Sequence, residues 1–131
     1  MGKEEAEKER DKIWKMSREF GETIMNLRVK KGYGLRQFAG MVGISPTYLS
    51  RMERGTDPPP AAEKIVKIAQ ELKTDPNQLL ALAEKLPREF KEVFTKNPTY
   101  TKRVPEFLRL AKEKNLTDND WKKIIRQLEE E

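Results

Sequence analysis

The sequence of 131 residues contains no cysteine and no histidine. Disulfides, thiolate nucleophiles, imidazole bases and the usual zinc or copper ligands are therefore excluded from its chemistry. Carboxylates remain, but they are scattered or lie in runs on expected helix surfaces, and no calcium-binding loop of the Asp-x-Asp type is present. We therefore expect a protein that is not an enzyme and that uses no cofactor or metal.

Long apolar runs are also missing. No segment approaches the roughly 20 apolar residues of a membrane-spanning helix, and the charged N-terminus lacks the apolar region of a secretory signal. Apolar residues make up 36% of the sequence and charged residues 37%, which suits one compact domain with a modest core. We expect a cytoplasmic location and no membrane partner.

The placement of charge is more informative than the net charge of +5. Residues 28–54 carry a single acid, Glu53, and their excess of positive charge matches that of the whole chain. The basic residues of this window are Arg28, Lys30, Lys31, Arg36, Arg51 and Arg54. A local basic surface is expected where a protein faces phosphate groups. On charge alone, a solvated basic helix face is an equal alternative.

Apolar residues recur at helical spacing along most of the chain, which predicts an all-α protein. Residues 1–16 are expected to form a charged, exposed helix that runs into the first helix of a five-helix domain over residues 17–86. The predicted helices of this domain cover residues 17–31, 35–42, 46–54, 61–72 and 76–85.

Residues 87–131 are predicted to form a helical C-terminal extension. Pro87 is expected to open one helix, which Asn97 and Pro98 end, and Pro105 to open a second. Residues 117–120 resemble a capping box before a third helix. The extension holds many large apolar residues, which predict a binding region for a regulatory protein or a homodimer interface, with the helix over residues 76–85 as the other candidate for the dimer interface. The alternative is that they extend the core of a monomer.

Segment 35–55 has the pattern of two short helices joined by a tight turn at residues 43–45. Ser45 and Pro46 suit the N-cap and first position of the second helix, and Gly43 and Gly55 suit the turn and the helix end. The residues expected to face the core are Ala39, Ile44, Leu49 and Met52. This pattern is typical of a helix-turn-helix, whose second helix enters the major groove of DNA.

Residues 20–86 resemble the lambda-repressor-like DNA-binding domain of the Cro/cI or XRE helix-turn-helix family. The resemblance rests on Leu27-Arg28, Phe38-Ala39, residues 42–45 and 49–55, Pro59, Ile68-Ala69 with Leu72, and Pro76 with Leu79-Leu80. It implies a transcriptional repressor that binds a palindromic operator in double-stranded DNA as a homodimer. It also implies an ion pair between Arg28 and Glu53 that orients the second helix of the motif.

The resemblance places the base-contacting positions on Pro46, Thr47, Ser50 and Arg51. Arg51 is the strongest candidate, because a guanidinium can donate two hydrogen bonds to O6 and N7 of guanine. The expected phosphate contacts are Lys31, Leu35, Arg36, Tyr48 and Arg54. Leu35 and Arg36 would offer backbone N–H groups at a helix N-terminus, whereas Tyr48 has the alternative of packing in the core.

Two departures from the family pattern concern phosphate binding. Gly34 and Leu35 stand where the family has a polar cap followed by Gln, and Thr56 and Asp57 stand where it often has Lys or Arg. We therefore expect a weaker grip on phosphate and a greater dependence on dimerisation.

Two other functions are compatible with parts of the sequence. A protein-interaction module such as an antitoxin would keep the fold without reading bases, but it would not need the arginines Arg51 and Arg54. An RNA-binding protein would need exposed aromatic side chains for base stacking, and only Tyr33 and Tyr48 are candidates.

Overall fold

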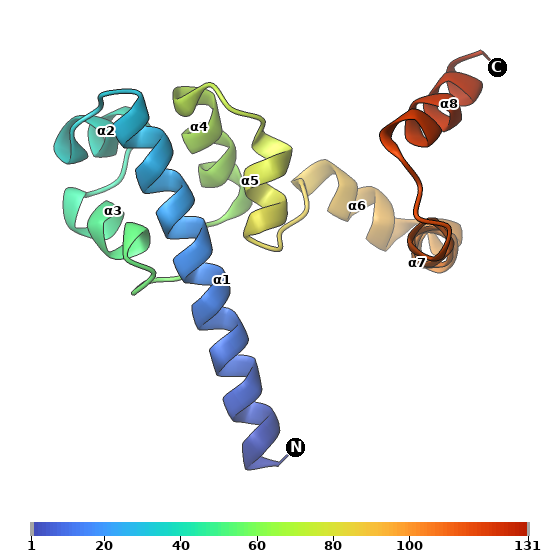
Figure 1. Ribbon diagram of the computed structural model, residues 1–131, viewed down its shortest axis with the longest axis horizontal. Coiled ribbons are helices and arrows are strands. Elements are labelled where there is room, and N and C mark those ends of the chain that lie inside the picture. Colours follow the sequence, from blue (N-terminus) through green and yellow to red (C-terminus); the bar gives the residue numbers. More distant parts are fainter. Residues whose placement is uncertain (1, 131) are drawn as a thin grey trace. The chain divides into compact units, whose positions relative to one another are not determined.

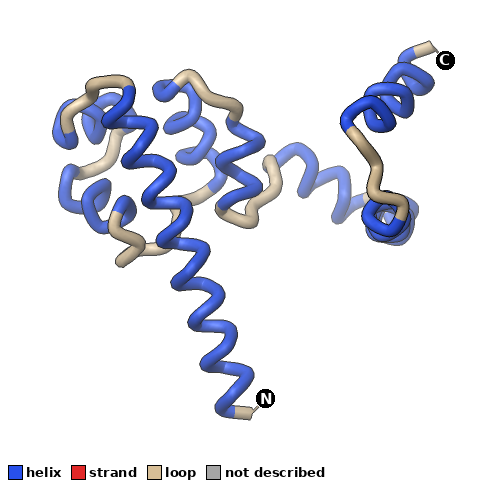
Figure 2. Tube along the Cα trace, in the orientation of Figure 1, coloured by secondary structure: helices blue, strands red, loops and turns tan. Residues whose placement is uncertain are grey.

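The computed structural model describes residues 2–130, with only the backbone for Arg88 (Figure 1). In this part of the chain every regular element is an α-helix and no strand occurs, so the all-α prediction is confirmed (Figure 2). None of the described helices is both long enough and apolar enough to cross a membrane. The chain divides into two units, of which the first ends at Arg88 and the second begins at Glu89.

The first unit contains the five helices predicted for the lambda-repressor-like domain. They are α1 (Lys3–Lys30), α2 (Leu35–Val42), α3 (Pro46–Glu53), α4 (Ala62–Leu72) and α5 (Pro76–Leu82). Helix α5 ends earlier than the predicted residue 85, because Glu84 adopts a left-handed φ of 55°. The backbone N–H of Lys85 then donates to the carbonyl of Leu80 at 2.8 Å, which closes the helix end.

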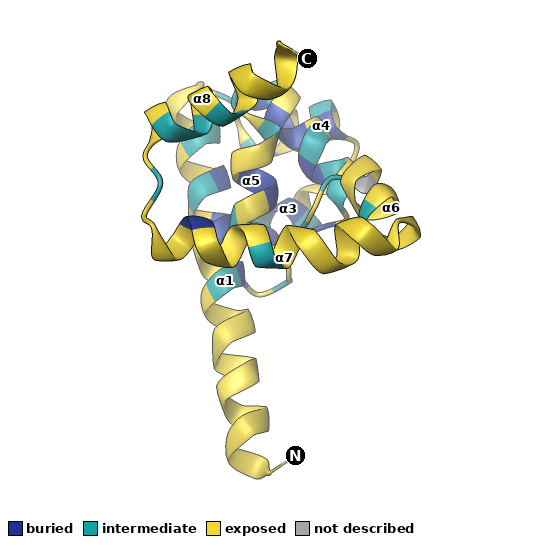
Figure 3. Ribbon diagram, turned by 90° about the vertical axis from the view of Figure 1, so that its right-hand side faces the viewer, coloured by how far each residue is buried: buried dark blue, intermediate teal, exposed yellow. Residues whose placement is uncertain are grey.

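Helix α1 runs without a break from the charged N-terminal segment into the domain (Figure 1). Residues 2–15 are all exposed, and burial begins only near Ser17 (Figure 3). The guanidinium carbon of Arg18 lies 5.3 Å from the centre of the Trp14 ring, a cation–π distance. The N-terminal half of α1 therefore has little tertiary support and depends on helix propensity and on contacts along its own surface.

The core lies where the five helices of this unit meet. Its largest side chains have no exposed surface, and burial of each such side chain stabilises the fold by about 1.5–3 kcal/mol. They are Phe20, Ile24, Phe38, Val42, Leu49, Met52, Ile65 and Ile68. The predicted core positions Ala39, Leu49 and Met52 are fully buried, and Ile44 is half-buried against the same cluster.

Glycine allows the backbones of α1 and α3 to touch. A Cβ added at Gly21 would collide with the carbonyl oxygen of Met52 and lie 2.6 Å from that of Glu53. A Cβ at Gly55 would lie 2.7 Å from the Cα of Arg18, and Gly55 itself has a φ of +76°. The C-terminal end of α3 is therefore pressed directly against α1.

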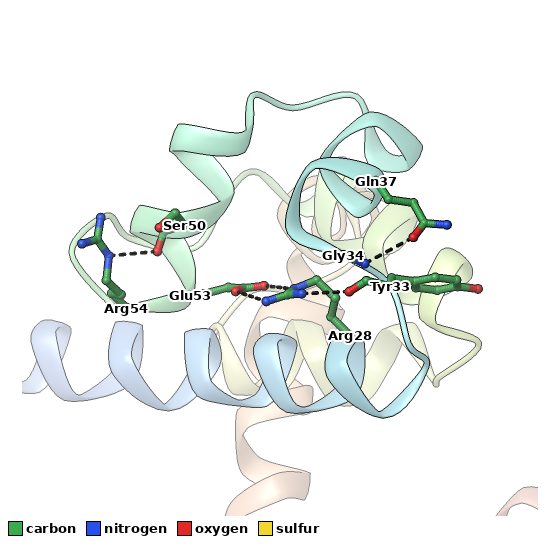
Figure 4. Close-up of polar contacts among 7 residues, drawn as sticks. All are labelled: Arg28, Tyr33, Gly34, Gln37, Ser50, Glu53 and Arg54. Carbon is green, nitrogen blue, oxygen red and sulfur yellow. Dashed lines mark hydrogen bonds and ion pairs between the residues drawn. The ribbon is translucent and has the colours of Figure 1, made fainter.

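An ion pair fixes the same two helices. Nε of Arg28 donates to Oε2 of Glu53 at 2.7 Å, and Nη2 donates to Oε1 at 2.9 Å. Nη1 donates to the backbone oxygen of Tyr33 at 2.8 Å (Figure 4). The side chains of Arg28 and Glu53 are only 12% and 4% exposed. The hydrogen bond to Glu53, opposed by burial, raises the pKa of Arg28 above its ordinary value.

The turn between α2 and α3 is held from both sides. Gly43 has a φ of +74°, the left-handed conformation that glycine adopts at little cost. Nζ of Lys64, on α4, donates to the carbonyl of Val42 at 3.1 Å and so satisfies the C-terminal end of α2. The angle at which α3 leaves α2 is therefore set by the turn itself and by a lysine from another helix.

The second unit contains most of α6 (Arg88–Lys96), together with α7 (Pro98–Glu113) and α8 (Asp118–Glu129). The prediction that Pro105 opens a helix is wrong, because α7 begins at Pro98 and continues through Pro105. Asn97 is the N-cap of α7, and its Oδ1 accepts from the N–H of Thr99 at 3.0 Å. A proline after a good cap starts a helix, whereas Pro105 only removes one hydrogen bond from its interior.

Helices α7 and α8 meet through few buried side chains. The rings of Phe107 and Trp121 pack edge to face with their centres 5.5 Å apart, and Ala111 is buried. The capping box at the start of α8 is present: Asp120 accepts from the backbone N–H of Thr117, and its own N–H donates to the Thr117 hydroxyl. These bonds to Thr117 lower the pKa of Asp120.

Many other large apolar side chains of the second unit are exposed. They are Phe90, Val93, Tyr100, Val104, Leu108, Leu110, Ile125 and Leu128.

Gly21→Ala is expected to lower the free energy of unfolding by about 1–3 kcal/mol, because the added Cβ must push α1 away from α3. Urea denaturation followed by circular dichroism measures the loss. Gly40→Ala is the matched control, since Gly40 also lies inside a helix but a Cβ there meets nothing within 4 Å. The control is expected to gain up to about 1 kcal/mol from helix propensity. Equal stability of the two variants would contradict the close contact.

Glu53→Gln is expected to destabilise the protein by about 3 kcal/mol, because it leaves the buried guanidinium of Arg28 without its counter-charge. Thermal unfolding would show this as a clear fall in Tm. Glu22→Gln is the control, because its pair with Arg18 joins two side chains of α1 that are 55% and 56% exposed. An exposed pair contributes about 0–1 kcal/mol, so a similar Tm for both variants would count against the structural role of Glu53.

Candidate nucleic-acid interface

Helix α3 turns one face to the core and the opposite face outward. Leu49, Met52 and Glu53 are buried, and the helical repeat then directs the intervening residues away from the core. The outward residues include Pro46, Thr47 and Arg51, which are exposed, and Ser50, which is half-buried. Oγ of Ser45 accepts from the N–H of Tyr48 at 3.0 Å and fixes the start of the helix. All four predicted base-contacting residues thus lie on one face.

Arg51 is paired with Asp57 of the following loop. Nε of Arg51 lies 3.1 Å from both carboxylate oxygens of Asp57, and Nη2 lies 2.9 Å from Oδ1. The two side chains are 49% and 27% exposed. The sequence analysis noted Asp57 only because it stands where the family often has a basic residue. Its pairing with Arg51 was not predicted. The only feature of the sequence that could have indicated this pair is the position of Asp57, six residues after Arg51 and just beyond Gly55, where the helix ends.

Tyr48 is half-buried and packs against the core cluster. Burial, followed by the nearby charge of Asp57, raises the pKa of its phenol. The ring of Tyr48 therefore packs in the core, which was the alternative to a phosphate contact. Contact of its hydroxyl with phosphate stays a prediction.

The predicted phosphate contacts on α2 lie in its first turn. The side chain of Leu35 packs partly against the core, so that only its backbone N–H is available for a phosphate. The side chain of Arg36 is exposed. Oε1 of Gln37 accepts from the N–H of Gly34 at 3.2 Å (Figure 4). Gln37, which the sequence did not single out, thus makes one of the two bonds of a capping box, whereas Gly34 has no side chain to accept from the first N–H groups of the helix. The first N–H groups of a helix have no partner within the helix and can bind an anion.

The two remaining phosphate candidates are basic residues just beyond helix ends. Lys31 follows α1 and is exposed. Arg54 follows α3, and its Nε donates to the carbonyl of Ser50 at 3.3 Å (Figure 4). The side chain of Arg54 is therefore folded back along α3, beside the candidate base-contacting residues.

The pairing of arginines with acids reduces the positive charge of the surface. Arg28 is neutralised by Glu53 and Arg51 by Asp57. Lys31 and Arg36 are exposed and have no ion pair within residues 2–130. The described residues also contain no group of acids that could hold a metal ion. The surface thus offers helix-borne hydrogen-bond donors and a moderate positive charge, which suit contacts to nucleic acid.

Residues 21–85 match the family model described as a helix-turn-helix domain. None of the curated proteins is significantly similar to the chain. Among solved structures, the biofilm regulator SinR in complex with DNA is 31% identical, covering 47% of this chain and 97% of that one, with a TM-score of 0.44.

Two further solved structures are similar to part of the chain. The restriction-modification controller protein C.AhdI from Aeromonas hydrophila is 27% identical over 50% of this chain and 94% of that one, with a TM-score of 0.47. SinR in complex with SinI is 27% identical over 73% of this chain and 97% of that one, with a TM-score of 0.44.

The family match spans the whole region that builds the outward face of α3. It includes the later part of α1 with Gly21 and Arg28, the turn at Gly43, and helices α2, α3, α4 and α5. Residues 21–85 therefore belong to the helix-turn-helix domain family of the XRE or Cro/cI type, a family of DNA-binding transcriptional regulators.

Proposed function

We propose that the protein is a repressor that binds a palindromic or pseudo-palindromic operator as a homodimer, with α3 in the major groove. The observation that carries this proposal is the division of α3 into two faces. Its buried face is held on α1 by the Arg28–Glu53 pair, and its outward face presents Thr47, Ser50 and Arg51. A helix presented in this way can enter a groove without rearrangement of the domain.

The residues of the outward face are assigned to base contacts. Arg51 donates to guanine, which discriminates against other bases by roughly 1–3 kcal/mol. Thr47 and Ser50 offer a hydroxyl to a base edge, and Thr47 also has a methyl group for thymine. Pro46 contacts the groove at the start of the helix.

The phosphate contacts are assigned to the positions around this face. Leu35 and Arg36 bind through the first turn of α2, and Lys31, Tyr48 and Arg54 bind through side chains. Since two arginines near this surface are already neutralised by acids, phosphate contacts alone give a modest affinity. The protein therefore gains from binding with two copies.

Homodimerisation is assigned to the second unit. Two groove-reading helices must lie about 34 Å apart to bind one side of the duplex. The apolar side chains that α7 and α8 leave exposed, such as Val104, Leu108 and Leu128, are too numerous for an isolated pair of helices in water. A second copy would cover them, and a regulatory protein that competes for the same face would separate the copies.

Selection of bound sequences from random duplex DNA tests the function. We expect two half-sites about one helical turn apart. Arg51→Ala should abolish preference at one base pair of each half-site, at a cost of about 1–3 kcal/mol. Lys31→Ala is a matched change of one basic side chain. It should weaken binding to all sequences and reduce the slope of log K against log salt concentration by about 1. Recovery of no preferred sequence would refute the proposal.

Sedimentation equilibrium tests the dimer. The full chain is expected to be dimeric at micromolar concentration, and Ile125→Asp to be monomeric, because a charge is placed among the exposed apolar groups of α8. Val29→Asp is the control, since Val29 is also an exposed apolar residue but lies on α1. A monomeric wild-type chain, or equal dissociation of both variants, would contradict dimerisation through the second unit.

A further inference from the structure

The ion pair between Arg51 and Asp57 places an acid beside the residue assigned to base recognition. Negative charge weakens binding to DNA, so an acid at this position needs an explanation. From the geometry we infer that Asp57 is a specificity-determining residue, which orients the guanidinium of Arg51 for a base and discourages its contact with phosphate. The inference rests on the proposed function and extends it to a residue outside α3.

The contacts leave Arg51 free to bind a base while it is paired. A guanidinium has five N–H donors, and the carboxylate of Asp57 engages the edge formed by Nε and Nη2. The edge formed by Nη1 and the second hydrogen of Nη2 remains unused by this pair. That edge can donate two parallel hydrogen bonds, the pattern that matches O6 and N7 of guanine. Pairing with Asp57 and recognition of guanine are therefore compatible.

The backbone of Asp57 is itself held in place. The loop leaves α3 at Gly55, which has a left-handed φ of +76° and lies against α1. The N–H of Thr56 then donates to the carbonyl of Arg51 at 2.9 Å. On the other side of Asp57, Pro59 and Pro60 are buried, and proline restricts the chain further. Asp57 is thus a fixed acceptor and not a mobile surface group.

A fixed acceptor has two consequences for binding. First, Arg51 is ordered before DNA arrives, so that less conformational entropy is lost when the guanine contact forms. Second, the charge of Asp57 cancels that of Arg51, and phosphate gains little from approaching the pair. Both effects favour the correct base over the backbone. The predicted result is a higher ratio of operator affinity to non-specific affinity.

The test compares Asp57→Asn with Asp11→Asn in the chain of 131 residues. Both variants lose one negative charge, but Asp11 lies on the exposed N-terminal half of α1. Fluorescence anisotropy gives the Kd for the selected operator, for the operator with its Arg51-dependent base pair changed, and for random duplex. Asp57→Asn should lower discrimination at that base pair by about tenfold, within the range of one bidentate contact, and should bind random duplex more tightly. Asp11→Asn should leave discrimination unchanged.

A second variant shows whether the effect of Asp57→Asn comes from the lost charge or from a local change in the loop. Asp57→Ser also removes the charge with a smaller side chain, and the same loss of discrimination is expected from it. Unchanged discrimination in both Asp57 variants would overturn the inference. The inference would also be overturned if Asp57→Asn gained more affinity for the operator than for random duplex. In that case the ion pair with Asp57 would keep Arg51 from contacting the base.

Failure of the inference can be told apart from failure of the proposed function. If the wild-type protein selects no sequence, the proposed function itself is wrong. If the wild type is specific and Arg51→Ala keeps that specificity, the assignment of Arg51 to a base and the inference about Asp57 are both overturned, whereas the proposal of an operator-binding repressor stands.

Discussion

The contact between α1 and the C-terminal half of α3 determines where the outward face of α3 points. Gly21 removes the side chain that would separate the two backbones, and the Arg28–Glu53 pair fixes their relative rotation. A buried ion pair adds little net stability compared with an apolar pair, but it tolerates few alternative arrangements. The candidate interface therefore depends on a contact that contains none of its own residues.

Acidic residues have two different roles around this interface. Glu53 is buried and acts within the fold, whereas Asp57 lies in a surface loop and acts on a side chain that remains half-exposed. Each engages an arginine through two of its N–H groups, which fixes orientation as well as charge. The basic character of residues 28–54 is consequently smaller than a count of charged residues indicates. Geometry, more than net charge, distinguishes this surface.

Much of the first unit was predictable from its sequence, because apolar spacing, Ser45, Gly43 and Gly55 act locally. The role of Gly21 and the pairing of Asp57 with Arg51 were not predicted, since both depend on contacts that form only when the chain folds. Pro105 was misread for the opposite reason: a local rule for proline was applied where the cap at Asn97 had already started the helix. The roles of α3 residues toward DNA still rest on the family resemblance and on their placement.

The sparse core of the second unit has a consequence for how the protein responds to its own abundance. A segment whose apolar groups are covered mainly by another molecule is stabilised by mass action, so that its folded fraction rises with the concentration of that molecule. If the covering molecule is a second copy, folding of α7 and α8 and pairing of the chains become one equilibrium. Occupancy of DNA would then rise more steeply than in proportion to the number of chains, without any ligand or additional regulatory domain.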